Sequence, residues 1–327
     1  MSGDFFLTRW AFLGMQWLYE TLTGGNIVLT IVVATLAIRL ISLFGDIKSR
    51  QSSLKMQSIQ PELDKIRKKY ANDSEKLARA QQKLMRDNNV SMFGGCLPML
   101  ITMPLFFIFF AAFRQWGQEM MAKLVVLMDQ DPAAGLEFFK NFRFLWVNNV
   151  WMPDNGLKSV LQPASEFFSA INKDLPRFLY FTGNTDPVPL ETFLRLGFFT
   201  QGADGTYALA SASEEIIARY DALMAPCLEL YQGFNNGWFI LPVLAGATSF
   251  LQSWLMSRGQ PQGQDAAASS NKMMLWLMPV MSVVFCLSNN SAFAVYWIMS
   301  NVFGILTNVA INRVFLKKKE IVEVENK

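Results

Sequence analysis

The sequence has no histidine and only three cysteines, Cys96, Cys227 and Cys286, among its 327 residues. Without histidine, a histidine general acid, a His-ligated metal and a Ser-His-Asp triad are all excluded. The cysteines lie far apart and are odd in number, which argues against a disulfide framework or a paired-cysteine zinc site. The phosphate-binding pattern GxxxxGK[ST] is also missing. The sequence therefore predicts no enzymatic activity, no cofactor and no metal.

Charged residues are also scarce, at 17% of the chain. Soluble domains have about a quarter of their residues charged. The chain is 52% hydrophobic, with 28 Phe, 18 Met and 9 Trp. This composition excludes a disordered chain and favours one that faces lipid.

Long apolar runs predict transmembrane helices, each of which needs about 20 largely apolar residues. Five stretches qualify or nearly do, and the fourth is the shortest: 26–45, 93–113, 238–257, 272–288 and 291–312. We therefore predict an all-α polytopic membrane protein with five transmembrane helices.

The distribution of charge predicts the orientation, because cytoplasmic loops are rich in Lys and Arg. Segment 46–92 has 11 Lys or Arg against 6 Asp or Glu, whereas 114–237 has 9 against 14. The tail 313–327 contains five Lys or Arg. Segment 46–92 and the tail are thus predicted to be cytoplasmic and 114–237 external. Five spans then place the N-terminus outside and the C-terminus inside.

The segments between the spans carry their own patterns. Residues 1–25 lack the features of a signal peptide and form an amphipathic pattern, typical of a helix on the outer interface; a packed soluble-type helix is the alternative. Residues 114–237 contain many aromatic side chains that need cover, so we expect an external subdomain or helices on the outer leaflet. Turn-forming residues at 201–205 fall within it, and 258–271 is predicted to be a cytoplasmic loop.

Segment 46–92 predicts a cytoplasmic hairpin of two short amphipathic helices, with Ser74 as the N-cap of the second. Its basic side chains suggest a docking arm for an acidic partner such as ribosomal RNA or anionic lipid. A solvated connector explains the pattern equally well. The candidate docking residues are Lys65, Arg67, Lys68 and Lys69.

Arg39 lies inside the first predicted span, where a charge costs roughly 2.5–3.5 kcal/mol on insertion scales. Thr35, Ser42 and Asp46 share its helix face, and this polar stripe is confined to the cytoplasmic half. No acidic residue lies within the five predicted spans, so we expect water to be the interaction partner of Arg39 there. The pattern favours a groove open to the cytoplasm, with snorkelling of a lone Arg as the alternative.

Two other spans contribute polar side chains. Thr248 and Gln252 share a face of the third span. On the fifth span, one face and its border hold Tyr296, Trp297, Ser300, Asn301, Asn308 and Asn312. These residues line the same groove or form interhelical hydrogen bonds, and for Thr248 and Asn308 we favour the hydrogen bonds.

Short motifs accompany these features in a fixed order. They are the intramembrane Arg39, Gln60-Pro61-Glu62-Leu63, Gly94-Gly95-Cys96-Leu97-Pro98-Met99 with Met103-Pro104, Met274-Leu275-Trp276-Leu277-Met278-Pro279-Val280-Met281, and Val295-Tyr296-Trp297-Ile298-Met299-Ser300-Asn301 with Ile311-Asn312-Arg313. In order and spacing they resemble the YidC/Oxa family of membrane-protein insertases, over about 26–113 and 238–315.

The resemblance implies an insertase and chaperone that places nascent hydrophobic segments into the bacterial plasma membrane without hydrolysing ATP. It implies that Arg39 lines a hydrated groove and that Thr35 and Trp297 touch the substrate. Ser42, Gln252, Tyr296 and Asn301 are expected to line the same groove. The implied partners are nascent membrane proteins, the ribosome, the Sec translocon, the signal recognition particle or its receptor, and the phospholipid bilayer.

The chain departs from the family in three places. Ser91-Met92 replaces the usual Asn-Pro before the Gly-Gly-Cys motif, and the external loop is expanded at about 156–236. A large N-terminal periplasmic domain is missing, which points to a Gram-positive-type relative, although the usual lipoprotein cysteine is missing too. A small transporter or channel is the alternative function, but it requires polar groups in both leaflets or an inverted repeat.

Overall fold

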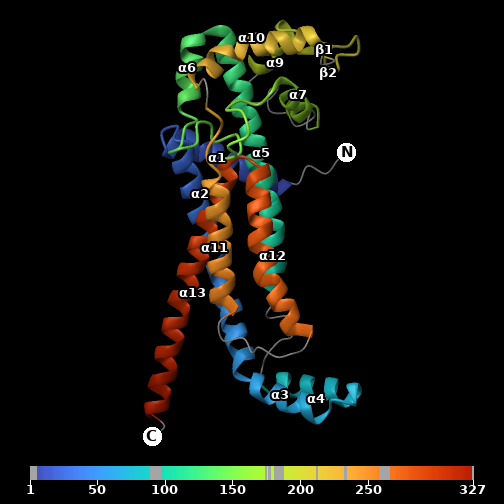
Figure 1. Ribbon diagram of the computed structural model, residues 1–327, viewed down its shortest axis with the longest axis vertical. Helices are drawn as coiled ribbons and strands as arrows, with labels where there is room; N and C mark the ends of the chain where they lie inside the picture. Colours follow the sequence, from blue (N-terminus) through green and yellow to red (C-terminus); the bar gives the residue numbers. More distant parts are fainter. Residues whose placement is uncertain are drawn as a thin grey trace. The chain divides into compact units, whose positions relative to one another are not determined.

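Figure 1 shows the computed structural model, which describes residues 6–88, 97–173, 175, 178–179, 188–210, 213–231, 234–257 and 266–325. These residues are mostly helical. The chain divides into two compact units: Met1–Ile31, Phe109–Val243 and Val284–Val295 form unit 1, and Val32–Ile108, Leu244–Val283 and Tyr296–Lys327 form unit 2. The boundary falls within each of five long helices, namely α2 (Ile27–Ser58), α5 (Leu97–Gln130), α11 (Ile240–Ser257), α12 (Ala266–Ser288) and α13 (Ser291–Glu325).

Unit 1 contains the predicted external segment. After α5 come α6 (Pro132–Lys140), α7 (Ala164–Lys173), α9 (Val188–Arg195) and α10 (Glu214–Leu230). Local sequence explains two of the helix starts. Asp131 caps α6 by accepting hydrogen bonds from the N–H groups of Ala133 and Ala134, with Pro132 in the first turn. Ser213 caps α10 by accepting one from the N–H of Ile216.

Aromatic side chains form the core of unit 1, as the sequence predicts. Phe167 stacks on Tyr220 with ring centroids 5.0 Å apart, which joins α7 to α10. Phe193 of α9 packs edge-on against Phe198 at 5.7 Å. The fully buried aromatic residues of this core include Phe139, Phe142, Phe167, Phe193, Phe198, Phe199 and Tyr220. Segment 114–237 therefore buries many of its aromatic side chains in a folded subdomain.

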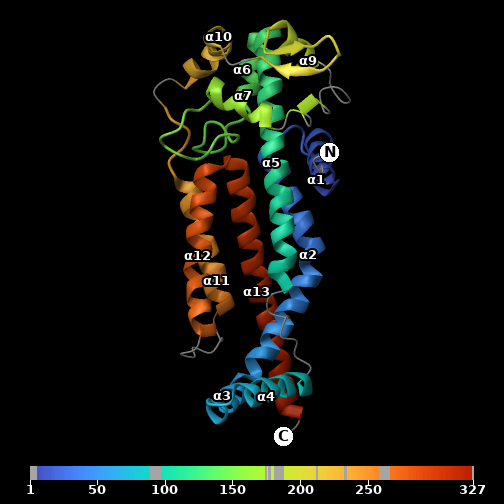
Figure 2. The ribbon, with the colours of Figure 1, turned by 90° about the vertical axis from the view of Figure 1, so that its right-hand side faces the viewer.

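A small antiparallel hairpin, β1 (Phe199–Gln201) and β2 (Tyr207–Leu209), lies beside α9 (Figure 2). Phe199 pairs with Leu209 and Gln201 with Tyr207. The turn occupies the residues that the sequence predicts, and Gly205 adopts φ +77° there. The sequence did not predict these strands, because three residues are too few to show a strand alternation, and the described chain remains mostly helical.

The N-terminal residues of unit 1 form α1 (Phe6–Trp17) and a short π-helix, η1 (Leu18–Leu22). Phe12 and Met15 are buried, whereas Leu7, Trp10 and Trp17 are exposed. One face of α1 thus packs on protein while the other leaves large apolar side chains uncovered. The placement of residues 1–25 at the outer interface stays a prediction.

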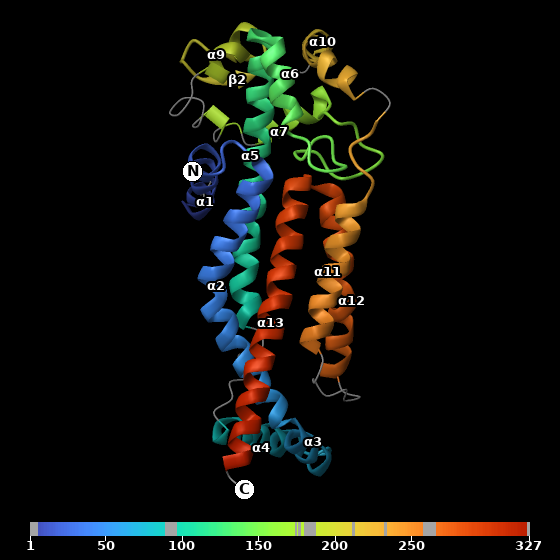
Figure 3. The same cartoon turned by 90° about the vertical axis from the view of Figure 1, so that its left-hand side faces the viewer.

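Unit 2 contains the hairpin of α3 (Gln60–Lys69) and α4 (Ser74–Asp87), seen in Figures 1 and 3. Ile59 and Leu63 are buried, and Met56, Leu84 and Met85 pack against them. The predicted N-cap of the second helix is wrong by one residue. Asp73, in extended conformation, caps α4 by accepting from the N–H of Lys76, and its carboxylate also pairs with the Lys76 ammonium at 2.9 Å. A carboxylate serves both contacts, which a serine hydroxyl cannot.

Three helices among the described residues are long and apolar enough to cross a membrane: Ile27–Lys48, Ile240–Ser257 and Ser291–Arg313. The fourth predicted span corresponds to α12, whose apolar part is the shorter Leu275–Ser288. Residues 93–96 of the second predicted span lie outside the described residues, and α5 continues it from Leu97. The five-helix core thus stays a prediction.

Helix α12 begins at Ala266, earlier than the predicted loop 258–271 allows. Residues 266–268 are all alanine, which has the highest helix propensity of any residue type, and this explains the early start. Figure 3 shows α11 and α12 side by side. A Cβ on Gly246 of α11 would lie 2.5 Å from Val283 Cγ2 of α12, so glycine is what permits this close approach.

Candidate substrate groove

The predicted polar stripe lies on one face of α2 in unit 2. Arg39 and Ser42 are half-buried, and the Ser42 hydroxyl donates to the Arg39 carbonyl at 3.1 Å. Thr35 is 1% exposed, so its hydroxyl faces protein in this structure. The stripe is therefore graded, from a buried Thr35 to partly accessible residues near the end of the span.

Two residues interact electrostatically with Arg39. One is Asp46, two turns further along the same helix. The other is Tyr296 of α13, which is buried. The candidate span Ile27–Lys48 includes Asp46. No acidic residue lies within the predicted bounds 26–45, so Asp46 is a neighbour of Arg39 just beyond them.

A second polar cluster joins α11, α12 and α13. The indole Nε1 of Trp297 donates to Ser249 Oγ at 3.0 Å and to Ser282 Oγ at 3.1 Å. Asn301 Nδ2 donates to Ser249 Oγ at 2.8 Å and to Thr248 Oγ1 at 3.1 Å. The two serine hydroxyls lie 2.8 Å apart. These bonds hold three apolar helices in register, where water is scarce.

Trp297 and Asn301 are thus in contact, as their spacing on the fifth span predicts. The interhelical hydrogen bond of Thr248 is confirmed. Asn308 instead donates to the Gly304 carbonyl of its own helix at 2.9 Å, and among the described residues this is the bond that it makes. Gln252 packs on Gly304, where a Cβ would lie 2.6 Å from Gln252 Nε2.

Ser249 and Ser282 are the residues that sequence reasoning missed. Both are almost completely buried. A serine in an apolar span has no water to bond, so it needs a partner in the protein. The sequence therefore indicates that each serine needs a hydrogen-bond partner in the protein, but it does not indicate which helix supplies that partner.

The Trp297 ring has a further neighbour on α5. Phe106 meets it edge to face, with centroids 5.2 Å apart. Trp297 therefore contacts α5, α11 and α12 from its place on α13.

The candidate docking residues lie at the end of α3. Lys65, Lys68 and Lys69 are exposed, whereas Arg67 pairs with Asp64 at 3.4 Å. The Lys69 ammonium lies 5.4 Å from the Tyr70 ring centroid. Three basic residues in the last turn complement the negative end of the helix dipole. Together the exposed Lys65, Lys68 and Lys69 form the cationic tip of α3.

These features define a multi-pass membrane protein with buried polar clusters between its apolar helices. The chain belongs to the 60Kd inner membrane protein family, whose model matches residues 17–319.

Named relatives agree with that family. A membrane protein insertase YidC of Clostridium perfringens is 36% identical over 149 residues, covering 45% of this chain and 54% of the relative. The YidC 2 insertase of Listeria innocua is 24% identical over 306 residues, covering 92% of this chain and 69% of the relative. The insertase MisCA of Bacillus subtilis is 24% identical over 301 residues, covering 91% and 74%. The match thus spans about half the length of the first relative and more of the others.

Proposed function

We propose that this chain is a membrane-protein insertase that places hydrophobic segments of nascent proteins into the bacterial plasma membrane and helps them fold. It acts alone or with the Sec translocon and consumes no nucleotide. The family match over 17–319 and the names of the relatives support this function.

The observation that carries the proposal is a half-buried arginine inside an apolar helix. Arg39 lies within the apolar candidate span Ile27–Lys48, accompanied by Ser42 and Asp46. Charged groups inside a membrane face a bundle interior or water. A hydrated groove at Arg39 would lower the cost of moving the polar flank of a client across the membrane. The client's apolar segment is then driven into lipid by burial.

The proposed groove residues are Thr35, Arg39, Ser42, Gln252, Tyr296, Trp297 and Asn301. Thr35 and Trp297 are buried or hydrogen-bonded in the present structure. For a client to reach them, α2 or α13 must shift. We therefore assign first contact to Arg39 and Ser42, which are accessible, and contact with Thr35 and Trp297 to a later stage.

The hairpin and the termini complete the proposal. The cationic tip at Lys65, Lys68 and Lys69 would dock the ribosome, the signal recognition particle or its receptor, or the Sec translocon. In the proposed orientation the hairpin and the C-terminus lie in the cytoplasm and the N-terminus lies outside. The exposed Trp10 and Trp17 of α1 suit the outer interface, where tryptophan is enriched.

Site-directed photocrosslinking during translation tests the function. A photoreactive residue at position 42, 35 or 297 should crosslink to the single span of a stalled nascent membrane protein. Ile41 provides the control, since it is 83% exposed on the opposite face of α2. Equal client crosslinking from 41 and 42 would contradict a groove on the Arg39 face. No client crosslink from any of the three positions would favour a transporter or channel.

A further inference from the structure

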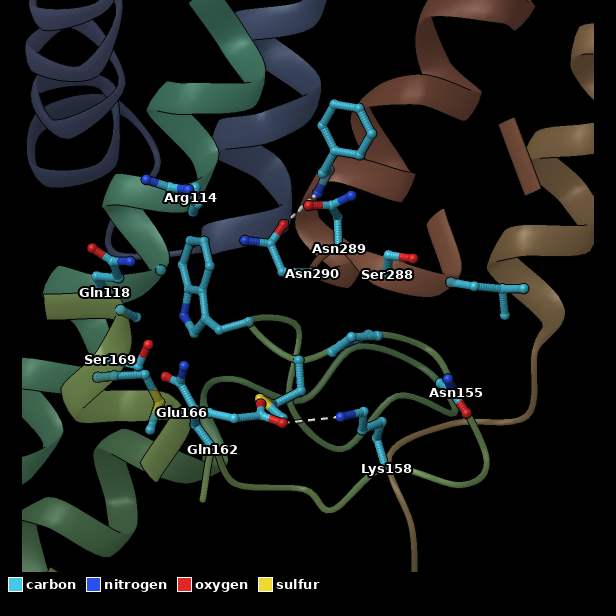
Figure 4. A pocket seen from close by; sticks show the side chains of 18 of the residues that line it. Arg114, Gln118, Asn155, Lys158, Gln162, Glu166, Ser169, Ser288, Asn289 and Asn290 are labelled. Carbon is cyan, nitrogen blue, oxygen red and sulfur yellow. Dashed lines mark hydrogen bonds and ion pairs between the residues drawn. The ribbon is translucent and has the colours of Figure 1, made fainter. Parts of the chain in front are cut away.

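Unit 1 contains a cavity of about 810 Å³ between α5, the segment 151–173 and the turn that joins α12 to α13 (Figure 4). This volume is within the range of sites that bind small molecules, about 300–1,000 Å³. None of the residues proposed for the substrate groove lines it. The cavity is therefore a candidate binding site for a ligand other than the client protein.

The cavity lies where the chain enters the membrane. Its lining includes Ser288, the last residue of α12, and the turn residues Asn289 and Asn290. The next residue, Ser291, begins the candidate span Ser291–Arg313. The ends of a transmembrane helix lie at the level of the lipid headgroups. The cavity is therefore at headgroup depth.

The lining is divided by polarity. Phe110, Leu287 and Phe293 supply an apolar wall from the membrane helices. Polar side chains supply the rest, and in Figure 4 Arg114 and Gln118 lie on the opposite side from Lys158. The apolar wall is made by the helices that enter the membrane. This is the pattern expected for an amphipathic ligand whose polar end is held by protein.

The lining is also positively charged. Three cations contribute, Arg114, Lys158 and Lys173, all with exposed side chains. Among the described lining residues, Glu166 is the one carboxylate, and it pairs with Lys158 at 3.0 Å. A net positive lining at headgroup depth selects an anion.

We propose that this cavity binds the headgroup of an anionic phospholipid. Lys158 and Lys173 attract the phosphate, Arg114 adds positive charge from the opposite side, and the Gln118 amide offers a hydrogen bond to the headgroup hydroxyls. The acyl chains follow Phe110, Leu287 and Phe293 toward the bilayer. A soluble phosphate ester would use the cations but gain nothing from the apolar wall. The proposal does not depend on the insertase function.

The test measures binding of three probes to the detergent-solubilised full chain by native mass spectrometry. These are dioctanoyl phosphatidylglycerol, dioctanoyl phosphatidylcholine and glycerol 1-phosphate. Phosphatidylglycerol should bind about tenfold more tightly than either other probe, because basic residues near the membrane surface favour anionic lipid. Equal binding of the two lipids would overturn the proposal. Glycerol phosphate binding as tightly as phosphatidylglycerol would also overturn it, and assign the cavity to a soluble ester.

Matched variants locate the site. The Lys158→Gln, Lys173→Gln double variant should bind phosphatidylglycerol about tenfold more weakly. Lys140→Gln is the control, because it breaks a similar exposed ion pair, with Glu137 at 3.1 Å, away from the cavity. Glu166→Gln should bind several-fold more tightly, a gain that misfolding cannot imitate. Unchanged affinity in both the double variant and Glu166→Gln would place the lipid elsewhere.

Discussion

The indole Nε1 of Trp297 lies 3.0 Å from Ser249 Oγ, in a hydrogen bond that helps to join α13 to α11. The proton of Ser282 goes to the Met278 carbonyl, 2.7 Å away. Ser249 must therefore donate its own proton to Ser282 Oγ while it accepts from Trp297 and Asn301. Ser249 thus has a full set of partners at the centre of three helices.

Removing this centre should destabilise the helix bundle moderately. In a double-mutant cycle of Ser249→Ala and Trp297→Phe, we expect a coupling free energy of about 0.5–1 kcal/mol, the usual size for such bonds in membrane proteins. Unfolding in mixed micelles by titration with sodium dodecyl sulfate measures it. The control is Ser288→Ala, whose hydroxyl bonds the Val284 carbonyl of its own helix. Zero coupling would show that the two side chains are neighbours without being partners.

Arg39→Ala should slow the insertion of clients that translocate a charged flank. Without the arginine, the barrier to moving that flank should rise, and the insertion rate falls about tenfold for each 1.4 kcal/mol added to the barrier. Reconstituted vesicles with a protease-protection assay report the inserted fraction over time. Arg39→Lys keeps the charge and should retain most activity, and clients with uncharged flanks should be unaffected. If Arg39→Ala inserts charged flanks at the normal rate, the groove does not act through this residue.

Neutralising the tip of the hairpin should weaken docking more than neutralising α4. Lys65, Lys68 and Lys69 show no ion pair among the described contacts, whereas Lys76 and Arg79 of α4 pair with Asp73 and Glu75. Changing the three α3 lysines to Gln should reduce co-sedimentation with ribosomes several-fold at low salt, because such charges act through screened long-range attraction.

The matching control for the hairpin is Lys76→Gln, Arg79→Gln and Lys83→Gln, which removes the same number of charges from α4. Circular dichroism verifies that both variants remain helical. Equal losses of ribosome binding in both would mean that net charge matters and the position of the tip does not.

Glu119 of α5, beyond the predicted span 93–113, makes stability depend on pH. Burial raises its pKa from the ordinary 4.5 to about 8, although Gln115 hydrogen-bonds it. Gln16 of α1 also donates to its carboxyl group, at 2.9 Å. Because the folded pKa is raised, the protonated form is favoured. The contribution of neutral Glu119 to the stability of the folded state is complete below pH 4.5 and is lost as the pH rises toward 8.

The Glu119→Gln variant should keep the neutral state at every pH. From pH 5 to pH 9 the free energy of unfolding of the wild-type chain should fall by on the order of 2 kcal/mol relative to this variant. The raised pKa allows a loss of this size. Thermal unfolding in detergent at both pH values measures the difference. Glu137→Gln, at an exposed ion pair, controls for a general charge effect. Parallel pH profiles for wild type and Glu119→Gln would contradict a buried neutral carboxyl.

Gly237→Ala should unfold the connection into α11. Gly237 has φ +86°, and a Cβ there would overlap Asp154 Oδ1. The fully buried Asp154 carboxylate accepts from the N–H groups of Trp238, Phe239 and Leu241. Displacing it would leave a buried charge without its donors, so we expect a loss of at least about 3 kcal/mol.

Gly205→Ala separates strain from overlap. Gly205 also has a left-handed φ, +77°, but a Cβ there meets nothing within 4 Å. Its cost should be about 1 kcal/mol, the ordinary penalty for a side chain in this conformation. Thermal unfolding compares the two variants, and similar losses in both would show that Asp154 contributes little.

The sequence by itself determined the helices and the polar positions. Apolar runs of membrane length, the scarcity of charge and the pattern Thr35, Arg39, Ser42 and Asp46 are local properties that periodicity reveals. Trp297 and Asn301 lie four residues apart, so a helix must bring them to one face. The sequence determined the helix ends less well. Asp73 and Ser74 are both good N-caps, and α12 begins at Ala266, inside a predicted loop.

Only the tertiary structure decided the partners. Ser249 and Ser282 look like isolated serines in the sequence, and their pairing with Trp297 depends on how α11, α12 and α13 pack. The cavity lined by Arg114, Lys158 and Asn290 likewise gathers residues from three distant segments. Periodicity describes one helix at a time, whereas hydrogen bonds and cavities depend on distances between helices, which packing alone sets.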